Sequence, residues 1–115
     1  MSEVSYVYVI AVAGRDLVKI GRSNDPVKRL AGLQTACPFP LEMICIHALP
    51  SRKAAADVER DIHRAYRGDH ANGEWFNVPP AAAAFVVEEN VETWKCFFIP
   101  GYSQIPGWEH EDMST

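Results

Sequence analysis

The sequence has few of the features that mark secreted, disulfide-bonded or membrane-spanning proteins. Its three cysteines, Cys37, Cys45 and Cys96, form neither a CxxC pair nor a Cys/His cluster, and an odd number does not fit a disulfide framework. The longest nearly uncharged run, residues 78–87, is too short to span a bilayer. The first residues also lack the basic and apolar regions of a signal peptide. We therefore expect a soluble, cytoplasmic protein whose cysteines are reduced and mostly buried.

Positive charge is also scarce, and most of it lies in the first part of the chain. The net charge is −4, yet residues 1–70 hold ten Lys or Arg against eight Asp or Glu, whereas residues 71–115 hold one Lys against seven acidic residues. An acidic total argues against a general nucleic-acid binder, but a local basic face can still hold phosphate. Such a face would be formed by Arg15, Lys19, Arg22, Lys28 and Arg29. The alternative is a solvated charged surface without a ligand.

The chain has the length of a single domain. Its 115 residues include 48% hydrophobic residues, which is enough to form a core. Alternating apolar residues predict strands, and Asp25 followed by Pro26 predicts a helix start, because aspartate caps free N–H groups. The predicted elements are strands 5–13, 17–21 and 41–48, helices 26–35, 52–67 and 80–90, a polar loop 68–73 and a short apolar segment 74–78. This order predicts an α+β fold in which helices pack on a small sheet.

Several polar side chains along this order suit the cleavage of a phosphodiester bond. That reaction needs a group that deprotonates water, positive charge for the phosphate and, commonly, a divalent cation on a carboxylate. Tyr8 and Lys19 fall on neighbouring strands, and Glu59 and His63 share one helix face at i and i+4. Mg²⁺ accepts a site with one carboxylate because it keeps several waters. The candidate catalytic residues are Tyr8, Lys19, Arg22, Arg29, Glu59 and His63, with Glu59 as the metal ligand.

These candidates also have purely structural interpretations. Arg29 could pair with Asp25 four residues earlier, and His63 could do no more than bond Glu59. Glu74, in the short apolar segment, is interpreted as part of a turn rather than as a site residue. Residue types alone therefore do not separate a site from an ordinary charged surface.

Short motifs in the same segment follow one another in order. They are Tyr6-Val7-Tyr8, Lys19-Ile20-Gly21-Arg22-Ser23, Asp25-Pro26, Arg29-Leu30, Glu59 with Ile62-His63, and Glu74-Trp75-Phe76. Together they resemble the GIY-YIG nuclease superfamily, and within it the phage and bacterial branch of the meiotically up-regulated gene type. The resemblance covers about residues 5–80, which we take as the motif core of a domain spanning residues 1–92.

The resemblance implies a central three-stranded antiparallel sheet flanked by helices. It also implies that Tyr8 orders the site, that Arg29 contacts the scissile phosphate and that Glu59 binds Mg²⁺ or Mn²⁺. Two positions depart from the superfamily pattern: Lys19 replaces the second motif's tyrosine, and Leu33 stands where some members have histidine. The general base is therefore open between Tyr8, a deprotonated Lys19 amine and hydroxide on a bound metal.

The function implied by the resemblance is metal-dependent endonuclease cleavage of DNA. One alternative is a non-catalytic domain of the same fold that only binds nucleic acid, since Lys19 replaces a candidate base. Another is a protein-interaction module or homodimer that uses residues 93–115, an acidic extension with several aromatic residues.

Overall fold

The computed structural model describes residues 4–102 and begins with an antiparallel hairpin. Strand β1 (Ser5–Val12) and strand β2 (Val18–Ser23) pair so that Tyr8 lies opposite Gly21. Gly14 makes the turn between them at φ 75°, a left-handed conformation that glycine adopts without steric cost. Strand β3 (Leu41–Leu49) pairs antiparallel with the other side of β1. These three strands form the predicted centre of the α+β fold.

The sheet contains five strands rather than the three that we expected. Strands β4 (His70–Asn72) and β5 (Trp75–Phe76) extend it beside β2, and the order is β3-β1-β2-β5-β4, antiparallel at each pairing. The sequence predicts a loop over residues 68–73 instead, because strands of two or three residues leave no alternating pattern. Gly73 at φ 56° allows the tight turn between them, and the His70 ring bonds the Gly73 carbonyl oxygen at 2.7 Å. A turn that seemed unstructured in the sequence is therefore part of the sheet.

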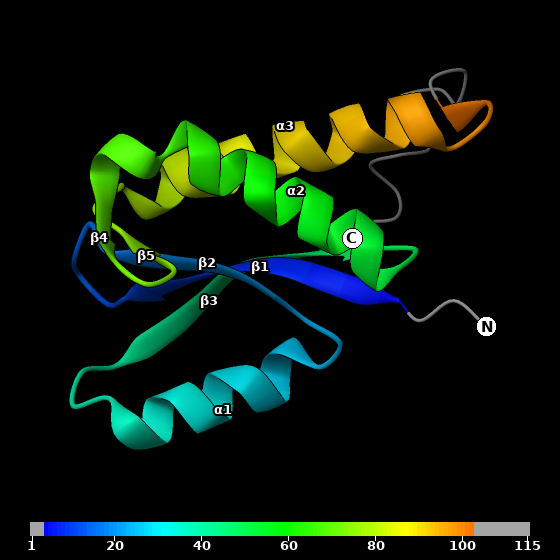
Figure 1. Cartoon of the computed structure of the whole chain (residues 1–115). Coiled ribbons are helices and arrows are strands. Elements are labelled where there is room, and N and C mark those ends of the chain that lie inside the picture. Colours follow the sequence, from blue (N-terminus) through cyan, green and yellow to red (C-terminus); the bar gives the residue numbers. More distant parts are fainter. Residues whose placement is uncertain (1–3, 103–115) are drawn as a thin grey trace.

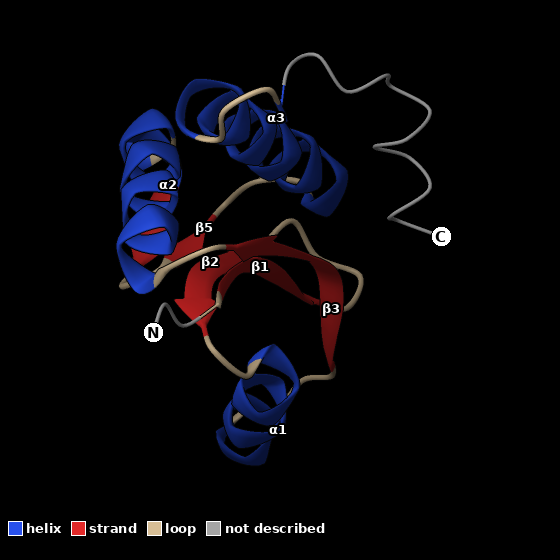
Figure 2. Cartoon of the chain, turned by 90° about the vertical axis from the view of Figure 1, so that its right-hand side faces the viewer, coloured by secondary structure: helices blue, strands red, loops and turns tan. Residues whose placement is uncertain are grey.

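The helices lie on both faces of the sheet (Figures 1 and 2). Helix α1 (Pro26–Ala36) covers one face, whereas α2 (Arg52–Ala65) and α3 (Pro80–Phe98) cover the other. Asp25 caps α1 as predicted, since its carboxylate accepts the Lys28 N–H at 3.1 Å. A short 3₁₀ turn, η1 (Arg67–Asp69), connects α2 to β4.

The main core fills the space between the sheet and the α2–α3 layer. Strand side chains alternate between faces, so Val7, Val9 and Ala11 point into this core. Tyr8 and Ile10 are equally buried, but they lie outside this core cluster and point to the face covered by α1. The alternation in β1 therefore separates a packed apolar face from a face that carries a buried hydroxyl.

The last helix is longer than the sequence suggested. We expected an end near residue 90, but α3 continues to Phe98 because the first helix-breaking pair, Pro100-Gly101, comes later. The helix thus runs through the expected boundary at residue 93, and residues 103–115 lie outside the described part of the chain. No helix within residues 4–102 is long and apolar enough to cross a membrane.

The cysteines are all free, but they are less buried than we expected. Cys37 and Cys45 are half-buried, and Cys96 is exposed on α3. Their spacing in the fold gives no sign of a shared ligand, because no group of three or more His, Cys, Asp or Glu able to hold a metal occurs within residues 4–102.

Candidate active site

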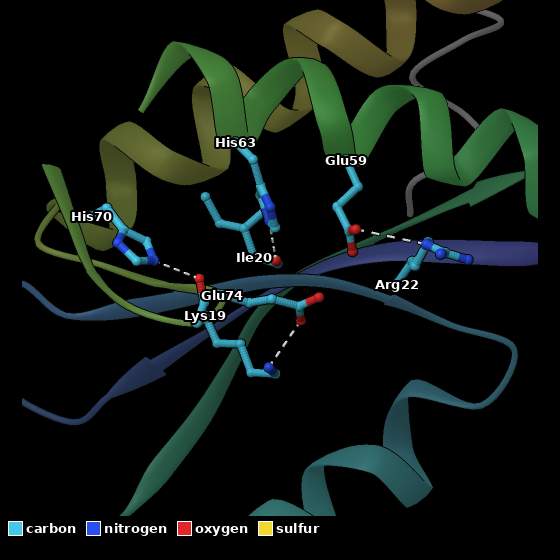
Figure 3. A network of polar contacts seen from close by, with 8 residues as sticks. Lys19, Ile20, Arg22, Glu59, His63, His70 and Glu74 are labelled. Carbon is cyan, nitrogen blue, oxygen red and sulfur yellow. Dashed lines mark hydrogen bonds and ion pairs between the residues drawn. The ribbon is translucent and has the colours of Figure 1, made fainter. Parts of the chain in front are cut away.

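The predicted site residues approach the outer edge of β2 from both faces of the sheet, near the point where its partner strand ends. Strand β5 pairs only with Val18 and Lys19. The next residue, Ile20, donates its N–H to the Glu74 carbonyl oxygen at 3.1 Å, and its own carbonyl accepts a bond from His63 Nε2 at 2.7 Å (Figure 3). Beyond Ile20, no described strand pairs with this edge. The edge is thus open at Gly21.

Tyr8 lies beside this opening with its side chain fully buried. Its hydroxyl oxygen has no hydrogen-bond partner among the described residues, which is unusual for a buried polar atom. Burial raises the pKa of Tyr8 above 10.0, and the carboxylates of Glu74 and Glu59 add to this shift. The Arg29 guanidinium opposes it, because it lies close enough to offer the phenol oxygen a hydrogen bond, although without the geometry of a formed bond. At neutral pH the side chain is therefore a phenol that can donate a hydrogen bond.

Lys19 and Glu74 form an ion pair on the same face of the sheet as Tyr8. The ammonium nitrogen donates to Glu74 Oε1 at 2.9 Å, and the lysine is only 9% exposed (Figure 3). The ammonium also lies 6.0 Å from the centre of the Trp75 ring. Lys19 is thereby held as a hydrogen-bond donor to a carboxylate.

Gly21 separates the two groups, and no larger residue would fit. A Cβ atom at this position would lie 2.6 Å from Tyr8 Oη and 3.0 Å from Glu74 Oε1. Real Cβ atoms essentially never approach as closely as the first distance. The phenol and the Glu74 carboxylate therefore flank one small space above Gly21.

Glu59 reaches the same edge from the opposite side. Helix α2 covers the sheet face away from Tyr8, but the Glu59 side chain extends to β2, where Oε1 lies 3.6 Å from Arg22 Nε (Figure 3). Oε2 is buried and has no hydrogen-bond partner among the described residues. Burial and the Glu74 charge raise the pKa of Glu59, against the opposing charges of His63 and Arg22. The Glu59 charge is also the smallest of the influences that raise the pKa of Tyr8, so the two groups interact across the sheet edge.

Arg29 approaches the cluster from α1. Its side chain is exposed, and within residues 4–102 no carboxylate forms an ion pair with it, so the expected alternative of a pair with Asp25 does not occur. The guanidinium lines an open hollow of about 490 Å³ together with Lys28 and the loop between β2 and α1. A second hollow shares Ser23 of this loop and adds Arg22. Cationic side chains thus border both sides of the loop.

His63 stands behind the cluster rather than in it. Its ring bonds the Ile20 carbonyl, as described above, and contacts the Phe76 ring with centroids 5.0 Å apart. The hydrogen bond to Glu59 that the sequence allowed is absent from the bonds of the described residues, although the His63 charge lowers the pKa of Glu59. His63 is therefore placed to hold α2 against β2.

The structure places the six predicted residues on two sides of β2. Tyr8, Lys19 and Arg29 lie on the side covered by α1. Glu59 and Arg22 pair on the side covered by α2, where His63 takes a supporting position.

The residue that sequence reasoning missed is Glu74, which we had interpreted as part of a turn. The available signal was its place in the Glu74-Trp75-Phe76 motif directly after Gly73. Pairing with β2 could not be read from two short strands, so nothing in the sequence brought Glu74 beside Lys19.

The fold and this cluster define a small α+β domain with buried carboxyl and phenol groups at an open sheet edge, bordered by arginines. The chain belongs to the T5orf172 domain family, whose model matches residues 5–95. Domains of this family occur in nuclease-like proteins of phages and bacteria. No curated protein and no solved structure matches the chain.

Proposed function

We propose that this T5orf172 domain is a metal-dependent endonuclease of the GIY-YIG type that hydrolyses DNA phosphodiester bonds. The observation that carries the proposal is the pair of buried polar atoms without close partners, Tyr8 Oη and Glu59 Oε2. The Arg29 guanidinium, which forms no ion pair with a carboxylate of the described residues, lies close enough to act on Tyr8. Unsatisfied buried polar groups cost stability, and in native proteins a catalytic role or a bound ion is among their explanations. A phosphate with its attacking water would supply the missing partners.

Glu59 fits the metal that this activity needs. A buried carboxylate oxygen without a partner suits a hard cation such as Mg²⁺ or Mn²⁺, which prefers oxygen ligands and completes its shell with water. When bound, such an ion supplies Lewis-acid stabilisation of the charge that develops on the phosphate and the leaving oxygen. Glu59 is the residue that would hold it.

The other side chains would bind the phosphate and orient the attacking water, each according to its chemistry. Arg29 and Arg22 provide positive charge for the phosphate, and guanidinium groups can bind its oxygens with two parallel hydrogen bonds. Tyr8, held as a phenol, donates a hydrogen bond that orients the attacking water or a phosphate oxygen. Lys19 adds a cation beside Gly21.

Plasmid nicking tests the proposal directly. Supercoiled DNA incubated with the purified chain and Mg²⁺ or Mn²⁺ should be converted to the open circular form. The Glu59→Ala variant should lose this conversion, whereas Glu89→Ala, which removes an exposed carboxylate from α3, should retain it. Equal nicking by the wild type and Glu59→Ala would refute the proposal.

A second function is a DNA-binding domain without catalysis. The observation that favours it is the ion pair of Lys19 with Glu74, because the residue in the tyrosine position is already engaged. This function predicts salt-sensitive DNA binding without nicking under either metal. The same plasmid experiment, combined with a filter-binding assay, separates the two functions.

A further inference from the structure

The general base is the part of the proposed reaction that the predicted residues do not supply. Tyr8 is held as a phenol, since burial raises its pKa. Lys19 Nζ donates a hydrogen bond to Glu74 and so points a proton, not a lone pair, at its neighbour. The Glu59 carboxylate is the group that fits the cation. A carboxylate near the Tyr8 hydroxyl would supply an acceptor that does not depend on hydroxide bound to the cation.

Glu74 meets this need by its position. Its Oε1 and the buried, unpartnered Tyr8 Oη flank the same point above Gly21, at 3.0 and 2.6 Å from a Cβ placed there. The Glu74 side chain is 38% exposed, so water can reach it, and an ionised carboxylate has acceptor sites left after the single bond from Lys19. A water molecule on the exposed side of this carboxylate would be deprotonated by it, close to the buried Tyr8 hydroxyl.

The turn that carries Glu74 is fixed on both sides. The His70 ring bonds the Gly73 carbonyl at 2.7 Å, and the Glu74 carbonyl accepts the Ile20 N–H at 3.1 Å. Lys19 then holds the side chain from the neighbouring strand. A carboxylate restrained at its backbone and its head group is preorganised, as a catalytic acceptor must be.

We propose that Glu74 is the general base of this site, an inference that rests on the proposed nuclease function. The Glu74 carboxylate takes a proton from the attacking water, whose oxygen forms the new bond to phosphorus. The bond between phosphorus and the leaving oxygen breaks, and that oxygen takes up a proton from solvent. Glu74 returns its proton to solvent, and the products are a phosphate monoester end and a free hydroxyl end.

The test compares Glu74→Gln with Lys19→Met and with the double variant. Glutamine keeps an oxygen that accepts from Lys19, but it is not a base, so kcat should fall by about 10²-fold or more while KM stays within a few-fold. Because the loss comes from Glu74 itself, it should persist in the Lys19→Met background. Glu89→Gln on α3 is the matched control, and Glu74→Asp, which keeps a carboxylate, should retain part of the activity. Thermal melts confirm that each variant is folded.

Three results separate this inference from the function beneath it. If the wild type cleaves and Glu74→Gln cleaves as fast as Glu89→Gln, the base assignment is wrong while the nuclease function stands. If Glu74→Gln loses no more than Lys19→Met and the two losses are not cumulative, Glu74 only positions Lys19. If the wild type cleaves no faster than Glu59→Ala, the nuclease function falls, and this inference falls with it.

Discussion

Glu59 shows at the level of one residue how function and stability conflict. Its carboxylate is buried beside Glu74, and one of its oxygens has no partner among the described residues. The pKa of Glu59 is raised above its ordinary value of 4.5, so the folded protein binds its proton more tightly than the unfolded chain does. Any stabilisation from this group is therefore complete below pH 4.5 and is lost as the pH rises through the folded-state pKa.

The Glu59→Gln variant should accordingly be more stable than the wild type at pH 7 and lose its metal-dependent nicking. Its advantage in the free energy of unfolding should shrink as the pH is lowered toward 4, where the wild-type carboxyl group becomes protonated and neutral as well. Chemical denaturation between pH 4 and pH 8 measures this difference. A lower stability of Glu59→Gln at pH 7 would show that the ion pair with Arg22 outweighs the burial of the charge.

The element in which a glycine lies decides whether a larger residue can replace it, as two glycines of this chain show. Gly21 in β2 faces Tyr8 and Glu74 at distances that leave no room for a methyl group, whereas Gly32 in α1 has nothing within 4 Å of its missing Cβ. Strand β2 therefore requires its glycine, and the helix does not. The motif that contains Gly21 therefore reflects packing as well as any chemistry.

We expect Gly21→Ala to lower the free energy of unfolding by roughly 1–3 kcal/mol, the usual cost of overpacking. Gly32→Ala should raise it by about 0.5–1 kcal/mol, because alanine loses less conformational entropy in a helix. Urea denaturation of the two variants provides matched measurements. Equal stability of both variants would mean that Tyr8 and Glu74 move aside without cost.

The sequence predicted some elements well and others poorly, for identifiable reasons. Long alternating or helical patterns identified β1, β3, α1 and α2 within a few residues, since each buries a continuous apolar face. Strands β4 and β5 were missed because two or three residues carry no periodicity. Glu74 was missed for the same reason, because its place in the site depends on pairing between β5 and β2. The order of motifs suggested Tyr8, Arg29 and Glu59 as site residues, whereas the burial of Tyr8 and Glu59 and the charges that act on them required coordinates.

At the scale of the whole molecule, charge is divided between two regions. Arg22, Lys28 and Arg29 border the loop between β2 and α1, whereas Glu88, Glu89 and Glu92 line a hollow on α3. A polyanion would be attracted to the first region and repelled by the second. This separation explains how a chain with a net charge of −4 could still bind DNA.

Salt dependence provides the corresponding measurement. Replacing Arg22, Lys28 or Arg29 with Gln should weaken DNA binding and reduce the slope of log affinity against log salt by about 1 for each phosphate contact removed. Lys95→Gln on α3, on the acidic side, should leave the slope unchanged. Filter binding at several salt concentrations suffices, and an identical slope for all four variants would place the DNA elsewhere.

The side chains of the candidate site come from separate stretches of the chain: β1, β2, α1, α2 and the turn before β5. No single stretch of the chain holds all of these side chains. Under the proposed function, a proteolytic fragment that lacks any of the stretches should therefore not cleave DNA. Under the proposed function, turnover in dilute denaturant would consequently track the fraction of intact molecules. The rate of DNA cleavage would then report the fraction of folded protein.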